Sequence, residues 1–344
     1  MSPRIRTILI EDSSFMRRVI SDVIAADNRI ELIGTAKNGK EGTELALREK
    51  PDVVITDMVM PGYDGLYVVK TLMETQPTPV IVLSTLDKNN SRIFDALQFG
   101  AFDFIDKPTD LNGRSLSDYA LCELVFQASQ ADVSLLRRSV VKVEKEIHFF
   151  STGSAYQIIA IGASTGGPGA IETIVLKLPS TLCVPVVIAQ HMPSRFLETF
   201  TQRLNNASAL QVKLASKGEA LLPGIVYIVP GESNSFIERN REDQQPVFGF
   251  THKTFDEFNN PSVNCLFESV AEVYGHRAIG VVLTGMGRDG SRGLKKIRAA
   301  GGFTIAQDEE SSVVFGMPKV AIEEKAAMAT VSLNDMSHYI LNQL

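Results

Sequence analysis

The sequence has 344 residues, about twice the length of a typical single domain, so we expect two domains. Hydrophobic residues make up 44% and charged residues 22%, a balance that is typical of globular proteins and excludes wholesale disorder. The formal net charge of −6 excludes the basic surface of a nucleic-acid-binding protein. The apolar runs are far shorter than the ~18–20 residues of a membrane span, so we expect no membrane insertion.

Three cysteines, Cys122, Cys183 and Cys265, are spaced neither as a CxxC motif nor as metal ligands. The N-terminus passes at once into a strand-like run and lacks the apolar core of a signal peptide. These features predict reduced, buried thiols and a cytoplasmic protein.

In the first hundred residues, short apolar runs alternate with helix-like segments. The predicted strands are residues 7–10, 31–36, 53–57, 80–84 and 102–105, with helices such as 14–26 and 39–49 between them. This alternation predicts a doubly wound parallel sheet with helices on both faces, the flavodoxin-like α/β class.

The second half returns to the same alternation after a mixed-charge stretch that indicates a linker. The predicted strands are residues 157–161, 184–189, 224–229, 278–283 and 304–306, whereas residues 232–255 predict a hairpin or a long loop. We expect a first domain over 1–125, a linker over 126–153 and a second, mostly parallel α/β domain over 154–344.

Acidic side chains follow the first and third predicted strands. Glu11 and Asp12 come directly after one strand, Asp57 ends the other, and Lys107 follows the fifth. Because the carboxyl ends of parallel strands meet at one edge, these groups should share a crevice. Three carboxylates there would repel each other unless a divalent cation such as Mg²⁺ neutralised them, and Ser84 and Lys107 could contact an anion on Asp57.

A candidate nucleophile lies in the glycine-rich turn after the first strand of the second domain. The segment 162–166 reads G-x-S-x-G with Ser164 at its centre, although a glycine turn with a capping serine explains this short pattern equally well. Of the five histidines, only His191 directly follows a strongly apolar strand run. His191 is therefore the candidate base for Ser164.

Asp289 lies just beyond another apolar strand and is the candidate acid that orients the base. Two alternatives remain. Asp289 could instead cap the following helix. Residues 285–290 also match the dinucleotide fingerprint G-x-G-x-x-G, and Asp308 lies near the position expected for a ribose-binding acid. A dinucleotide-dependent enzyme therefore stays open on the pattern alone, as does a non-catalytic signalling adaptor.

Residues 4–124 resemble the receiver domain of two-component response regulators. The resemblance is carried by ILIEDSS (8–14), ITDMVMPGYDG (55–65), VLST (82–85) and DKP (106–108). It implies that Asp57 accepts a phosphoryl group from a sensor histidine kinase. The further roles that it implies are Mg²⁺ binding by Glu11, Asp12, Asp57 and the Val59 carbonyl, phosphoryl binding by Ser84 and Lys107, and an aromatic switch at Phe104.

The second half resembles the chemotaxis protein-glutamate methylesterases, the CheB family. The motifs are IGASTGGP (161–168), QHMP (190–193), LPGIVYIVPG (222–231), PSV (261–263), LTGMGRDG (283–290), AQDE (306–309) and VFGMP (314–318). The resemblance implies a catalytic triad of Ser164, His191 and Asp289, with Thr165 and Met286 beside the oxyanion.

The implied activity is hydrolysis of glutamyl methyl esters on methyl-accepting chemoreceptors, and the family also deamidates receptor glutamines. The hydrolytic step needs no cofactor, and the tethered receiver is expected to block the site until Asp57 is phosphorylated. The sequence departs from the family pattern at Glu11, where aspartate is common, at Asn234, where we expect histidine, and at Asn264, where aspartate is usual.

Overall fold

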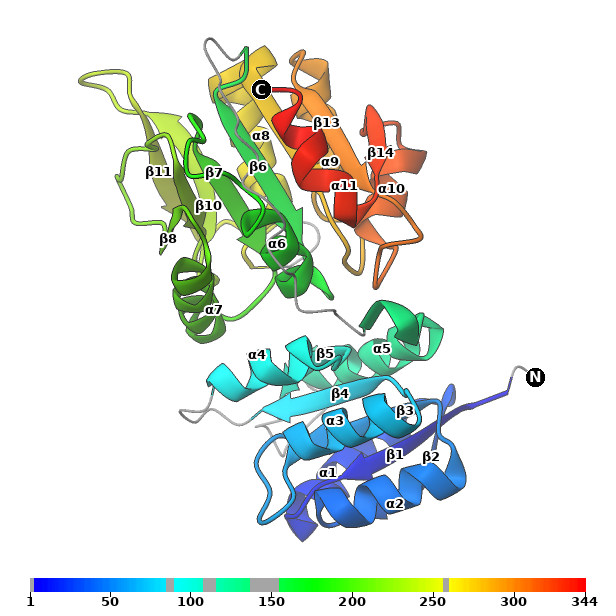
Figure 1. The fold of residues 1–344 in the computed structure, drawn as a ribbon. Helices are drawn as coiled ribbons and strands as arrows, with labels where there is room; N and C mark the ends of the chain where they lie inside the picture. Colours follow the sequence, from blue (N-terminus) through cyan, green and yellow to red (C-terminus); the bar gives the residue numbers. More distant parts are fainter. Residues whose placement is uncertain (1–2, 85–89, 108–115, 137–154, 256–259) are drawn as a thin grey trace. The chain divides into compact units, whose positions relative to one another are not determined.

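A computed structural model describes residues 3–84, 90–107, 116–136, 155–255 and 260–344 (Figure 1). The chain divides into two compact units, Met1–Val140 and Val141–Leu344. The last helix of the first unit, α5, spans Leu116–Gln130 and is followed by a 3₁₀ turn over Val133–Leu136. The helix therefore runs five residues beyond residue 125, the expected last residue of the first domain.

The first unit is built on a five-stranded parallel sheet in the order β2-β1-β3-β4-β5. The strands are β1 (Ile5–Ile10), β2 (Ile30–Ala36), β3 (Val53–Asp57), β4 (Val80–Ser84) and β5 (Asp103–Asp106). The other helices are α1 (Ser14–Ala25), α2 (Gly39–Glu49), α3 (Gly65–Thr75) and α4 (Asn90–Gln98). The doubly wound fold predicted from the sequence is confirmed.

Local chemistry explains where these elements begin. Every residue of β3 and β4 is buried, as expected of strands covered on both faces. The side chains of Ser13, Asn38 and Asp64 accept hydrogen bonds from the first turns of α1, α2 and α3. The strand order reverses between β1 and β3, and this switch point places the ends of both strands at one crevice.

The second unit contains a seven-stranded parallel sheet in the order β14-β13-β12-β6-β7-β9-β8. Its strands are β6 (Ile158–Ala163), β7 (Val186–Gln190), β8 (Gln211–Leu214), β9 (Ile225–Ile228), β12 (Ala278–Val282), β13 (Phe303–Gln307) and β14 (Ala329–Val331). Its helices are α6 (Gly167–Val175), α7 (Ser194–Ala207), α8 (Val263–Tyr274), α9 (Ser291–Ala299), α10 (Met317–Glu323) and α11 (Leu333–Leu341), with a 3₁₀ turn over Gly275–Arg277.

The sheet of the second unit separates two layers of helices. Helices α8, α9 and α10 pack together on one face, and α6, α7 and α11 lie on the other (Figure 1). The central strands β6, β7 and β12 are fully buried. The strand order reverses between β6 and β12, so the loops after these strands face a second crevice.

The polar stretch before α8 forms an antiparallel hairpin of β10 (Asn234–Arg239) and β11 (Pro246–Thr251). This confirms the hairpin interpretation of residues 232–255. Strands β8 and β14, of four and three residues, were not predicted. Among the described helices, none is both long enough and apolar enough to cross a membrane.

Candidate functional site

The three candidate residues of the second unit follow three neighbouring parallel strands. Ser164 comes directly after β6, His191 directly after β7, and Asp289 lies in the loop between β12 and α9. The backbone N–H of His191 donates to the carbonyl of Ala163 at 3.0 Å, and Ala163 is the residue directly before Ser164. The structure therefore brings Ser164 and His191 to the same edge of the sheet.

The turn that carries Ser164 is fixed by contacts with the loop after β12. The N–H of Ser164 donates to the carbonyl of Thr284 at 3.1 Å, and the hydroxyl of Thr284 donates to the carbonyl of Thr165 at 3.0 Å. Gly166 has a φ of 75°, a left-handed conformation that glycine adopts at low cost. A methyl group at Gly285 would lie 2.6 Å from the Cβ atom of Ser164, so this approach also requires glycine.

His191 and Asp289 form a hydrogen-bonded pair. Nε2 of His191 lies 2.8 Å from Oδ2 of Asp289, and the two side chains are 11% and 0% exposed. Because Asp289 engages Nε2, Nδ1 is the ring nitrogen that can serve as a proton acceptor. Among the described residues, no hydrogen bond joins the Ser164 hydroxyl to this ring. Such catalytic hydrogen bonds often form only when the substrate binds.

Asp289 lies against the N-terminus of α8. The backbone N–H groups of Val263, Asn264 and Gly290 donate to its carboxylate at 2.7, 2.9 and 2.9 Å. Burial raises the pKa of the carboxyl, but the hydrogen bond and charge of His191, with the N–H groups of Asn264 and Val263, outweigh burial and lower it. Asp289 is therefore an anion at neutral pH.

Thr165 and Met286 flank the nucleophile, as the sequence resemblance implies. Thr165 is buried beside Ser164, and half-buried Met286 follows Gly285, which contacts Ser164. Among the described residues, the hydrogen bonds include none donated by the backbone N–H of Thr165 or of Met286. Two main-chain donors next to the nucleophile are thus available to a developing oxyanion.

The two asparagines that depart from the family pattern both support the acid. Asn234 donates to the carbonyl of Lys253 at 2.8 Å and accepts the N–H of Ser262, the N-cap of α8, at 2.6 Å. The side chain of Asn264 accepts the N–H of Gly293 at 2.8 Å. The amide of Asn234 therefore holds the start of α8, and the amide of Asn264 holds the start of α9. Both helix starts lie next to Asp289.

The dinucleotide interpretation of residues 285–290 is not favoured. In a nucleotide fold, the first N–H groups of the following helix bind the pyrophosphate. Here Gly290, Ser291 and Gly293 donate to Asp289, to Arg288 and to Asn264 respectively. The start of α9 thus already has acceptors within the protein.

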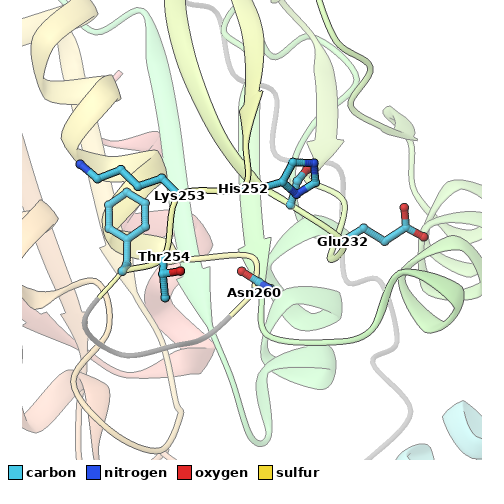
Figure 2. Close-up of a pocket in the computed structure, with 7 residues that line it drawn as sticks. Glu232, His252, Lys253, Thr254 and Asn260 are labelled. Carbon is cyan, nitrogen blue, oxygen red and sulfur yellow. The ribbon is translucent and has the colours of Figure 1, made fainter.

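A small polar pocket lies between the hairpin and the segment before α8. It is lined by Glu232, Ser233, His252, Lys253, Thr254, Phe255 and Asn260 (Figure 2). The charged side chains of Glu232 and Lys253 point away from each other in Figure 2. None of the site residues predicted from the sequence lines this pocket.

The predicted acidic site of the first unit is also assembled. Oxygen atoms of Glu11, Asp12 and Asp57 lie within 4.8 Å of one another. The ammonium of Lys107 lies 2.8 Å from both Glu11 and Asp57. Burial raises the pKa of the Glu11 and Asp57 carboxyls, and Lys107 opposes this effect. Three carboxylates against one ammonium leave an excess of negative charge, and an all-oxygen donor set fits a divalent metal ion.

The other residues predicted for this site lie in or just after β3, β4 and β5. The N–H of Val59 donates to the Asp57 carboxylate at 3.3 Å. The carbonyl of Ser84, at the end of β4, accepts the N–H of Lys107 at 2.8 Å, so these two residues lie side by side. Phe104 lies half-buried in β5, the strand that pairs with β4.

Sequence reasoning missed the residues that hold the site together. The side-chain amide nitrogen of Gln190 donates to the carbonyls of Ser164 and His191 at 2.9 and 3.1 Å. Gln307 accepts the N–H of Thr284 at 2.8 Å and so supports the loop beside Ser164. Both glutamines end buried strands at the site edge, and both fall within motifs of the family resemblance, QHMP and AQDE. These two signals could have found them.

Comparison with known protein families gives two matches. The model of the CheB methylesterase family matches residues 159–340, and the response regulator receiver domain model matches residues 7–113. The two models together cover most of the chain, and each falls within one of the two units.

Two relatives match this chain over more than nine-tenths of its length. A protein-glutamate methylesterase/protein-glutamine glutaminase 2 of Methanosarcina acetivorans is 37% identical, with 98% of each chain covered. The Bacillus subtilis protein-glutamate methylesterase/protein-glutamine glutaminase is 40% identical over 93% of this chain and 92% of the relative. The crystal structure of the Thermotoga maritima CheB methylesterase catalytic domain is 36% identical with a TM-score of 0.53, covering 55% of this chain and 99% of that one.

Proposed function

The chain belongs to the CheB methylesterase family, and from this premise we propose that Ser164, His191 and Asp289 form the catalytic triad of a protein-glutamate methylesterase. The substrate is a glutamyl methyl ester on a methyl-accepting chemoreceptor, and the products are glutamate and methanol. The same site deamidates receptor glutamines. The observation that carries this assignment is the 2.8 Å contact between His191 and Asp289 at the edge that also holds Ser164.

The geometry supports the order of proton transfers. Nδ1 of His191 takes the proton of the Ser164 hydroxyl as its oxygen attacks the ester carbonyl. Asp289 keeps the other nitrogen, Nε2, protonated and stabilises the imidazolium that forms. The imidazolium then gives its proton to the leaving methoxide, and methanol departs from the acyl-enzyme. His191 next activates a water that hydrolyses the acyl bond and frees Ser164.

The backbone N–H groups of Thr165 and Met286 stabilise the tetrahedral oxyanion. A preorganised donor of this kind typically contributes ~3–4 kcal/mol to the transition state. The same donors serve deamidation, in which ammonia replaces methanol as the leaving group. The hydrolytic step uses side chains and main-chain groups of this chain together with a water molecule.

We assign phosphorylation to the first domain, residues 1–125 together with the end of α5. The residues that follow, up to 153, connect it to the second domain. Asp57 accepts the phosphoryl group from a sensor histidine kinase. Mg²⁺ would be held by Glu11, Asp12, Asp57 and the carbonyl of Val59, and it would supply positive charge that offsets the charge of the phosphoryl group. Ser84 and Lys107 contact the phosphoryl oxygens, and Phe104 is the aromatic switch. The fit of the acidic cluster to an oxygen-binding cation supports this assignment.

Methanol release from methylated chemoreceptor membranes tests the proposal. The wild-type chain should release methanol, faster when a small phosphodonor is present, and Ser164→Ala should release none above the uncatalysed rate. Equal release by the wild type and Ser164→Ala would exclude the serine mechanism. Release that a phosphodonor leaves unchanged would exclude control by the first unit.

A further inference from the structure

Gln190 is the last residue of β7 and directly precedes the candidate base. Its side chain is buried at 2% exposure. The side-chain amide nitrogen donates to the carbonyl of Ser164 at 2.9 Å and to the carbonyl of His191 at 3.1 Å. One amide group therefore contacts the main chain of both the nucleophile and the base.

This contact lies where the backbone pairing of the two strands ends. Ala163 is paired with Gln190 in the sheet, and the N–H of His191 still donates to Ala163. Beyond this point the chain after β6 turns into α6, and the chain after β7 leads into α7. The Gln190 amide thus takes over from the main chain in holding the two segments together.

The orientation of the amide is decided by its partners. Only the nitrogen end can donate to two carbonyls, so the oxygen Oε1 must point the other way. Oε1 is buried and has no hydrogen-bond partner among the described residues. Such an unpaired acceptor is costly, so packing alone favours an apolar side chain here.

Gly167, the first residue of α6, makes room for this amide. A methyl group at Gly167 would lie 2.0 Å from Oε1 of Gln190. The glycine-rich turn therefore has a second role besides the shape of the Ser164 loop, because it admits the Gln190 side chain.

We propose that Gln190 is a positioning residue of the hydrolytic site, whose two amide hydrogens hold the main chains of Ser164 and His191 at a fixed separation. This inference rests on the proposed hydrolase function. Serine attack depends on the distance and angle between hydroxyl and imidazole, and a displacement of about 1 Å can lower the rate by about 10²-fold. The hydrogen bonds of Gln190 go to main-chain carbonyls and not to the Ser164 hydroxyl or the His191 ring.

Gln190→Met tests the proposal, because methionine has a similar length and no donor. The control is Thr304→Val, which removes a buried hydroxyl that donates to the carbonyl of Ala326 and accepts the N–H of Met328. Like Gln190, Thr304 makes two hydrogen bonds through its side chain, but neither involves Ser164 or His191. Methanol release from methylated receptor membranes is measured for the full-length chain and divided by the number of serines titrated with a fluorophosphonate.

We expect kcat per titrated site to fall by about 10²-fold in Gln190→Met, with KM little changed and Thr304→Val close to the wild type. A purely structural role would reduce the number of active sites and leave kcat per site unchanged. An unchanged kcat per site would therefore overturn the proposal.

Gln190→Glu provides a second variant of nearly the same volume. In alkaline buffer its carboxylate presents only acceptors to the two carbonyls, so we expect a loss at least as large as in Gln190→Met. Wild-type kcat per site in Gln190→Glu would also overturn the proposal. Ser164→Ala separates the two hypotheses. If Ser164→Ala retains wild-type hydrolysis, the proposed function is wrong. If Ser164→Ala is inactive and Gln190→Met is fully active, only the role of Gln190 is refuted.

Discussion

Nε2 of His191 lies 2.8 Å from Oδ2 of Asp289, although 98 positions of sequence separate the two residues. The contact exists because β7 and β12 flank β6 in a parallel sheet, so the loops after both strands meet at one edge. The N-terminus of α8 completes the arrangement by donating two N–H groups to the same carboxylate. The fold thus keeps a buried anion next to the imidazole.

Asp289→Asn should lower kcat by about 10⁴-fold. An amide cannot accept from the ring and from three backbone N–H groups as a carboxylate does, and it would favour the wrong tautomer of His191. Methanol release measures the effect, with Asp335→Asn, an exposed carboxylate at the start of α11, as the control. A loss smaller than about tenfold would contradict the role given to Asp289.

Asp289 should also make the second unit sensitive to acid. Its pKa is lower in the folded state than the ordinary value of 3.8, so the ionised carboxylate stabilises the fold. This contribution is present above the ordinary value and is lost as the pH falls below it toward the folded pKa. Denaturant unfolding at neutral and acidic pH should show a smaller acid-induced loss of stability for Asp289→Asn than for Asp335→Asn. Equal losses would contradict the expected shift.

Much of this arrangement could be predicted from the sequence, for physical reasons. Buried parallel strands such as β3 and β12 begin as continuous apolar runs, and the end of each strand marks the edge of its own sheet. In this way β3 places Asp57 at the edge of the first sheet, and β12 leads to Asp289 at the edge of the second. The short edge strands β8 and β14 lack that signal, since only part of each is buried.

The partners of the site residues could not be predicted. Val263 and Asn264 hold Asp289 through backbone N–H groups, which no residue type encodes. Gln190 acts through a side chain that ends an ordinary buried strand. These contacts depend on which helix and strand ends meet in three dimensions.

Asp57→Asn should abolish labelling of the chain by a small phosphodonor, because an amide oxygen does not form the acyl phosphate. Asp52→Asn is the matched control, since Asp52 is exposed at the opposite end of the same strand, where it accepts the N–H of Arg6. Incorporation of labelled phosphate checks the result, and full labelling of Asp57→Asn would exclude Asp57 as the acceptor.

Removal of divalent ions with a chelator should prevent this labelling in the wild type as well. Hydrolysis of a small ester by the unphosphorylated chain should continue at its original rate in the same sample. Labelling that survives the chelator would contradict metal binding by Glu11, Asp12 and Asp57.

Deletion of residues 1–140 should raise the basal rate of hydrolysis. The chain divides into its two units after Val140, so this cut leaves every element of the second sheet in place. The expected reason is that the unphosphorylated receiver inhibits the esterase. Methanol release by the fragment and by the intact chain is compared without phosphodonor, and a fragment no faster than the intact chain would argue against inhibition.

The most direct measurement is the site and rate of labelling by a fluorophosphonate, which reacts with a serine activated by a neighbouring base. Mass spectrometry of the wild-type chain should locate a single adduct on Ser164, and labelling should be slowed greatly in His191→Ala. A chain whose adduct lies on another residue, or a His191→Ala variant that reacts at the wild-type rate, would contradict the triad.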